Sequence, residues 1–140
     1  MENRILEEDV QLHLQFEKRG SLLPVIVQEE ESKEVLMLGY TNSEAFEKTV
    51  HSGLATFWST SRQQLWTKGE TSGDYLHVKS IRVDCDQDAL LYLVSLAGNG
   101  VCHTRDAGGN TRKSCFYRFY DLKNELLEHL DVNRHIDTNL

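Results

Sequence analysis

The chain has 140 residues, of which 39% are hydrophobic and 26% charged, and its formal net charge is −7. These values predict one folded domain and argue against wholesale disorder. An acidic chain is a poor candidate for nucleic-acid binding. No apolar run approaches the roughly 18–20 residues of a membrane span, and the N-terminus lacks a signal pattern. We therefore expect a cytoplasmic protein that binds neither nucleic acid nor membrane.

The first half of the chain predicts strands and one helix. Alternating apolar residues from Val10 to Phe16 predict an extended segment or a short helix. Two apolar runs separated by an acidic turn, Leu22–Gln28 and Glu34–Tyr40, predict a β-hairpin. Residues 41–44 fit a capping box with Thr41 at the N-cap, and Gly53 fits the stop, so a helix is expected between them.

The second half predicts more strands and a closing helix. Strands are expected at Ala55–Ser61, His77–Asp86, Ala89–Leu96 and Cys115–Tyr120, with a polar loop at Gln63–Gly73. Four leucines at helical spacing predict a final helix: Leu122, Leu126, Leu127 and Leu130. We therefore expect a mainly β, α+β domain over residues 1–121, a C-terminal helix and frayed tail over 122–140, and no doubly wound parallel sheet.

The three cysteines Cys85, Cys102 and Cys115 indicate a metal site. A cytoplasmic chain keeps thiols reduced, and an odd number cannot all pair. Their spacings fit no common structural zinc finger, and three thiolates would leave one zinc position open for water, as in catalytic sites. His103 is a candidate fourth ligand or proton carrier. A lone strand cysteine is more often a small buried hydrophobe, which is the alternative for Cys85.

An alternating acidic stretch surrounds Cys85. If the segment is extended, Asp84, Asp86 and Asp88 share one face and Cys85 points to the other. Three carboxylates suit a hard cation such as Mg²⁺, whereas a thiolate suits Zn²⁺. The alternative for the stretch alone is a solvated turn or strand edge.

Four motifs together resemble the phosphoribosyl-AMP cyclohydrolase family of histidine biosynthesis, over roughly Leu14 to Tyr120. The motifs are Phe57–Arg62 with Leu65-Trp66 and Lys68–Gly73, then Asp84–Leu90, then Cys102-His103-Thr104, and finally Ser114–Tyr117. Four motifs in one order are far more specific than any one alone.

The resemblance implies an intertwined homodimer that holds zinc across its interface, with Cys85 from one chain and Cys102 and Cys115 from the other. It places Mg²⁺ on Asp84, Asp86 and Asp88. The implied reaction opens the purine ring of phosphoribosyl-AMP between N1 and C6 with zinc-activated water, giving the phosphoribosyl-formimino carboxamide intermediate.

That reaction needs proton transfer and a basic pocket for a substrate with two phosphates. His103 is the first candidate for proton transfer and Glu70 the second. Tryptophans at these positions are more often core residues, and single lysines such as Lys113 are more often solvated. The candidate substrate-binding residues are Trp58, Ser59, Ser61, Arg62, Lys68, Ser72 and Arg112.

One feature departs from the family pattern. Cys102 and Cys115 are 13 positions apart, and Asp106–Asn110 reads as an insertion that Gly108 and Gly109 allow to bulge outward. Two alternatives to the cyclohydrolase stay open: a divergent paralogue that hydrolyses another cyclic amidine or purine-like compound, and a non-catalytic zinc-binding module.

Overall fold

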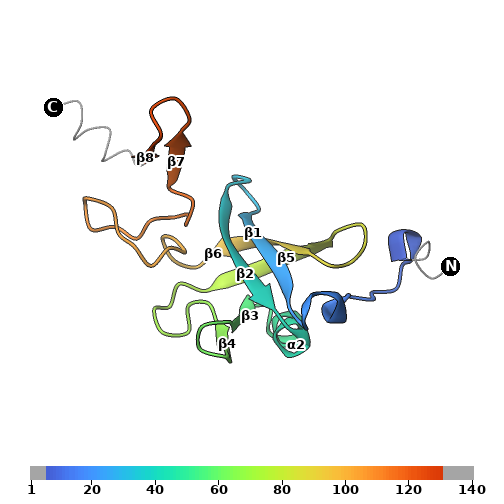
Figure 1. The fold of residues 1–140 in the computed structure, drawn as a ribbon. Coiled ribbons are helices and arrows are strands. Elements are labelled where there is room, and N and C mark those ends of the chain that lie inside the picture. The colour runs from blue at the N-terminus through green and yellow to red at the C-terminus, as the bar shows by residue number, and fades with distance from the viewer. Residues whose placement is uncertain (1–5, 131–140) are drawn as a thin grey trace.

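A four-stranded mixed sheet forms the centre of the computed structural model, which describes residues 6–130 (Figure 1). Its strands lie in the order β2-β1-β6-β5, where β1 is Leu23–Glu29, β2 is Val35–Thr41, β5 is Leu76–Val83 and β6 is Leu90–Leu96. β1 and β6 are parallel, and the β1–β2 and β5–β6 pairs are antiparallel. The predicted first hairpin is therefore confirmed.

The remaining elements flank this sheet. They are the 3-10 helix η1 (Phe16–Arg19), the helix α2 (Ser43–Ser52), the hairpin of β3 (Thr56–Ser59) and β4 (Gln64–Thr67), and the hairpin of β7 (Arg118–Asp121) and β8 (Leu126–His129). The expectation of a β-rich α+β fold is confirmed. None of the helices within residues 6–130 is long and apolar enough to cross a membrane.

The helix α2 begins one residue later than its capping pattern predicts. Asn42 is the N-cap, and its side-chain oxygen accepts the backbone N–H of Ala45 at 2.8 Å. Thr41 is not the cap because it is still paired in β2, opposite Leu23. Gly53 ends the helix in the left-handed region, as predicted.

One face of the sheet carries the hydrophobic core. Along β1, Val25 and Val27 are fully buried while Ile26 between them is exposed. The core cluster also includes Phe57 from β3 and Tyr92 from β6. The opposite face stays apolar, because Ile26 pairs with Leu38, which is similarly exposed, and Tyr40 is also exposed there. An apolar sheet face is thus left unpacked within one chain.

The predicted closing helix is wrong for the described part, up to Leu130, because β7 and β8 form a hairpin there. Asp121 Oδ1 accepts the backbone N–H groups of Lys123 and Asn124, which builds a turn between the two strands. Leucine spacing alone could not reveal this, since an amphipathic helix needs a core surface to cover and these leucines remain exposed. Residues 131–140 lie outside the described residues.

Three predicted boundaries also shift. The loop predicted at Gln63–Gly73 contains β4, which pairs with β3 along its whole length. The predicted strand His77–Asp86 ends at Val83, so the aspartates lie in a turn. In the last predicted strand, regular pairing starts only at Arg118. The mostly polar composition of Gln63–Gly73 hid this strand, whose pairing with β3 forms it.

Candidate active site

The turn between β5 and β6 brings three carboxylates together. Oxygen atoms of Asp84, Asp86 and Asp88 all lie within 4.8 Å of one another. The sequence pattern predicted that the alternation of an extended strand would bring these carboxylates together, but this is not the cause. Asp84 Oδ1 accepts the backbone N–H groups of Asp88 at 2.8 Å and Ala89 at 3.0 Å, which curls the turn inward. The oxygen donor set suits a hard divalent cation.

Two cations from η1 contact this cluster. Lys18 Nζ lies 3.0 Å from Asp86 and 2.8 Å from Asp88, and Arg19 lies 3.1 Å from Asp88. The hydrogen bond from Lys18 is the main reason why the pKa of Asp88 falls well below its usual range. Burial is the main reason why the pKa of Asp84 is raised. The cluster therefore attracts positive charge, and η1 supplies it in this structure.

Gln87 joins the same turn to the N-terminal arm, which we define as residues 6–15. Its side-chain oxygen accepts the N–H of His13 at 2.6 Å, and its backbone carbonyl accepts the N–H of Gln15 at 2.8 Å. Its side-chain amide donates to Leu6 at 3.2 Å. A cavity of about 300 Å³ between arm and turn has Cys85 in its lining, and Cys85 is exposed. Gln87 therefore fixes the arm to the turn that carries Cys85.

A second framework positions Cys102 and Cys115. The N–H of Cys102 donates to the carbonyl of Arg112, and the N–H of Cys115 donates to Leu36 in β2. Gly100 permits this pairing, because a Cβ there would lie only 2.4 Å from the Arg112 carbonyl oxygen. Ser114 is buried and its hydroxyl donates to Val35 at 2.7 Å. Both cysteines are thus fixed by backbone contacts.

The two thiols of this framework meet. Cys115 lies within hydrogen-bonding reach of Cys102, and burial of the thiol, followed by the influence of Cys102, raises the pKa of Cys115 to about 11; Lys68 acts in the opposite direction. Cys102 Sγ also contacts Thr104 Oγ1 at 2.9 Å and accepts the N–H of Thr104 at 3.4 Å. A sulfur pair with hydrogen-bond donors aimed at one member fits a zinc ion.

Cys85 does not join them within one chain. It precedes β6, whereas Cys102 follows β6, and seven residues of strand span roughly 20 Å. Cys115 is tied to Leu36, which lies near the end of β1 that pairs with the C-terminal half of β6. Within residues 6–130, the aspartates form the one group of three metal-ligating side chains, so neither Cys85 nor His103 completes a triplet with the other cysteines.

The expected insertion folds on itself. Arg105 pairs with Thr111 in an isolated bridge, and Asp106 Oδ1 accepts the N–H groups of Gly108 and Asn110. Arg105 also donates to the carbonyl of Gly109 at 3.1 Å. The longer gap is therefore absorbed in a closed loop, and the thiols at its two ends stay together.

The remaining candidates divide between two places. Lys68 lies close enough to Cys115 to influence its pKa. Glu70, exposed in the same loop, accepts the N–H of Thr67 at 2.9 Å, and Ser72 accepts the N–H of Asp74. His103 is exposed directly after Cys102. These residues come from the open end of the β3–β4 hairpin and from the cysteine framework.

The turn at the other end of that hairpin holds a second group. Ser59 Oγ contacts Ser61 Oγ at 3.3 Å and accepts the N–H of Arg62 at 3.1 Å. Trp66 stacks against Phe57 at 5.4 Å between ring centroids, so its main contacts are with the core. Trp58 is partly buried and pairs with Leu65.

Arg112 occupies a defined position beside Cys102. Its guanidinium donates to Thr104 Oγ1 at 3.2 Å and lies 4.0 Å from the centroid of the Tyr117 ring. Sequence reasoning gave no role to Thr104, Lys18, Arg19 or Gln87. The charged residues of Phe16–Arg19 can be read from the sequence. Their contact with a turn that lies 68 residues later in the chain depends on the fold.

Comparison with known proteins identifies close relatives. The family model described as phosphoribosyl-AMP cyclohydrolase matches residues 37–117. A phosphoribosyl-AMP cyclohydrolase of Desulfatibacillum aliphaticivorans is 50% identical over 110 residues, which cover 79% of this chain and 83% of the relative. One from Archaeoglobus fulgidus is 55% identical over 107 residues, covering 76% and 92%. A histidine biosynthesis bifunctional protein of Bacteroides thetaiotaomicron is 52% identical over 93 residues, covering 66% of this chain and 45% of the relative.

Proposed function

This chain belongs to the phosphoribosyl-AMP cyclohydrolase family, and we propose that it opens the purine ring of phosphoribosyl-AMP between N1 and C6 in histidine biosynthesis. The observation that carries the proposal is the family match over residues 37–117, which spans both the aspartate turn and the cysteine framework. The closed loop at 105–111 leaves the paired thiols in place and therefore gives no reason to change the substrate.

The complete site is proposed to need two subunits. Cys102 and Cys115 lie together, while Cys85 lies at the other end of β6. A two-fold axis can pair opposite ends of two antiparallel copies, which would bring Cys85 to the partner subunit's Cys102 and Cys115. The exposed apolar sheet face with Ile26 and Leu38 supports such a contact, because a surface of this kind is usually buried in an interface.

Zinc held by these three cysteines would supply a Lewis acid that lowers the pKa of water toward neutrality. His103 is proposed to move a proton at the ring nitrogen, which is supported by its exposure beside Cys102. Arg112 and Lys68, both near the thiol pair, are proposed to bind phosphate groups by charge-assisted hydrogen bonds. The aspartate turn is proposed to hold Mg²⁺, consistent with its oxygen donors.

The serine and arginine group at the β3–β4 turn is proposed to bind the more distant part of the substrate. Ser59, Ser61 and Arg62 offer hydroxyl and guanidinium donors at one end of the hairpin, and Lys68 lies beyond the other. Four strand residues separate these ends by about 13 Å. A substrate with two phosphates could use both ends.

A ring-opening assay with purified protein and phosphoribosyl-AMP tests the activity. We expect absorbance changes from ring opening that stop when a zinc chelator is added and return with added Zn²⁺. Absence of ring opening by zinc-loaded, folded protein contradicts the proposed substrate.

Subunit mixing tests the shared site. Cys85→Ala and Cys102→Ala proteins are each expected to be inactive, because each lacks one ligand in both sites. After unfolding and refolding together, about half of the dimers are mixed, and each mixed dimer has one intact site of two, giving about one quarter of wild-type activity. Each variant refolded alone is the control. Failure to regain activity, with mixed dimers present, would place the three cysteines in some other arrangement.

A further inference from the structure

The β7–β8 hairpin projects away from the sheet (Figure 1). It carries exposed apolar side chains. Leu122 at its turn is 84% exposed. A two-stranded hairpin is marginally stable by itself in water, so a hairpin of this kind is expected to pack on something. Its other exposed apolar residues are Phe119, Tyr120, Leu126, Leu127 and, just after it, Leu130.

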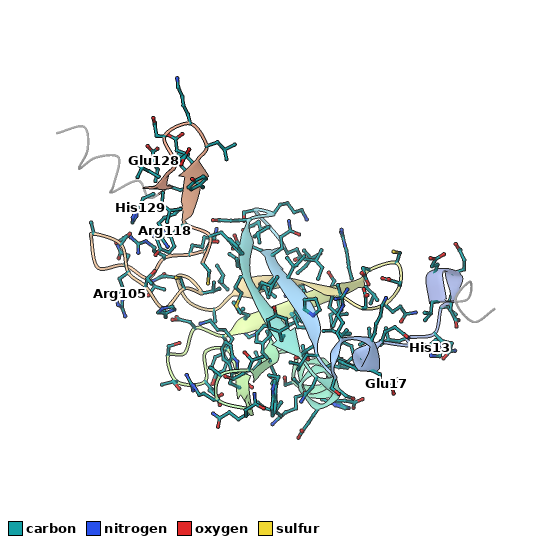
Figure 2. All side chains as sticks on the ribbon, viewed as in Figure 1. His13, Glu17, Arg105, Arg118, Glu128 and His129 are labelled. Atoms are coloured by element: carbon teal, nitrogen blue, oxygen red, sulfur yellow. The ribbon has the colours of Figure 1, made fainter. Side chains whose placement is uncertain are left out.

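The opposite extremity of the molecule carries a second uncovered segment. Figure 2 shows Arg105, Arg118 and His129 at one extremity and His13 and Glu17 at the other. In the N-terminal arm, Val10 is 97% exposed and Leu12 is 52% exposed. Gln87 fixes this arm to the turn that carries Cys85. The hairpin, in turn, begins three residues after Cys115.

Opposite charges face each other only at the base of the hairpin, because β7–β8 beyond that base carries three carboxylates, Asp121, Glu125 and Glu128, and one lysine. Residues 6–12 of the arm contain Glu7, Glu8 and Asp9 and no lysine or arginine. At the base of the hairpin, the guanidinium groups of Arg112 and Arg118 lie 4.0 and 5.2 Å from the centroid of one tyrosine ring. An acidic, partly apolar arm therefore matches the two arginines at the base of the hairpin by charge, and the exposed apolar residues of the hairpin by hydrophobic contact.

We propose that the β7–β8 hairpin of one subunit packs against the N-terminal arm of the other. This inference rests on the proposed shared zinc site, which requires Cys85 of one chain to meet the partner subunit's Cys102 and Cys115. The arm is attached beside Cys85 and the hairpin directly follows Cys115, so the same dimer brings them to one place. The occupant of each uncovered surface is thus a second copy of this chain.

Photocrosslinking of the full-length protein tests this contact. The photoreactive residue p-benzoylphenylalanine replaces Val10, whose exposure lets the new side chain fit without disturbing the core. After irradiation we expect a band at twice the chain mass on a denaturing gel, with the crosslink mapped to residues 116–130. The control places the same residue at Val50, which is exposed on α2 and should not crosslink to the hairpin.

A substitution gives a second readout. Leu122→Asp puts a charge on the most exposed apolar residue of the hairpin and should raise the dimer dissociation constant at least about tenfold. Val50→Asp, which changes an apolar residue on α2 that is 54% exposed, should leave that constant unchanged. Analytical ultracentrifugation measures both, and circular dichroism verifies that each variant is folded.

The outcomes separate this inference from the proposed function. A zinc-loaded dimer whose Val10-position crosslinks fall outside residues 116–130, or whose dissociation is unaffected by Leu122→Asp, overturns the docking and leaves the shared site standing. Hairpin crosslinks in a protein that does not open phosphoribosyl-AMP support the docking and overturn the substrate. A monomeric wild-type protein at micromolar concentration overturns both the docking and the shared site.

Discussion

The aspartate turn and the cysteine framework lie at opposite ends of β6 and differ in how complete they are. The three carboxylates come from five consecutive positions, and two cations of the same chain already contact them. The cysteine framework joins segments from three parts of the chain and still brings together only two thiols. Carboxylates brought together by one turn find cation partners in the same chain. Thiols brought together by tertiary contacts can leave a ligand position for a second subunit.

The largest expected effect comes from removing a thiol of the cysteine framework. Cys102→Ala should remove bound zinc and lower the rate of ring opening about 10³-fold or more, because the metal contributes several kcal/mol to such reactions. Zinc content by atomic absorption and the ring-opening assay measure both. Asn110→Ala, in the exposed loop, is the control and should retain zinc. A zinc-loaded Cys102→Ala protein would show that the framework is not the metal site.

A smaller effect is expected from the residue that supports Cys102. Thr104→Val removes a hydroxyl that contacts the sulfur at 2.9 Å and should lower zinc affinity about 10–100-fold, as for other residues that orient a metal ligand. Competition with a chromophoric chelator measures the affinity. Thr104→Ser keeps the hydroxyl and should stay close to wild type. Equal affinities for Thr104→Val and the wild type would leave the hydroxyl without a role.

At the aspartate turn, a substitution is expected to raise metal affinity and not to lower it. Lys18→Gln removes a cation that contacts Asp86 and Asp88, so a divalent cation no longer competes with it. Because the side chain of Lys18 is half exposed, Mg²⁺ affinity should rise only by a factor of about two to five. Titration calorimetry with Mg²⁺ measures this change. Lys33→Gln in the β1–β2 turn is the control, and unchanged or weaker binding by Lys18→Gln would contradict the competition.

The smallest effect concerns the contact that ties the cysteine framework to β1. Lys113 Nζ lies 2.5 Å from Glu29, and this hydrogen bond is the main reason why the pKa of Glu29 is lowered. A carboxyl with a lowered folded-state pKa stabilises the fold above its unfolded pKa of about 4.3, and this contribution is lost as pH falls through the folded value.

Lys113→Met should therefore lower the free energy of unfolding by about 0.5–1 kcal/mol at pH 7, and the difference should shrink toward zero near pH 3. Urea denaturation at the two pH values measures it. Lys123→Met, in the exposed turn of the β7–β8 hairpin, is the control and should show no such pH dependence. A difference that persists at pH 3 would assign the effect to packing and not to the ion pair.

Much of the fold could be predicted from local patterns. The β1–β2 hairpin and the end of α2 at Gly53 were predictable because apolar runs and a glycine stop act over a few residues. The strand β4 and the β7–β8 hairpin were not, because their pairing depends on partners rather than on their own composition. For the same reason, four leucines at helical spacing gave the wrong element.

For the site, the sequence by itself determined which side chains are present and, through the order of the motifs, the family. Cys85, Cys102 and Cys115 could be named as candidate ligands. Asp84, Asp86 and Asp88 could be named as neighbours, because a five-residue span limits how far apart they can be. Only the tertiary structure decided that Cys102 meets Cys115 while Cys85 lies at the other end of β6. The reason is physical: seven residues of extended strand hold their two ends roughly 20 Å apart, and nothing in the sequence of one segment specifies which distant segment lies beside it.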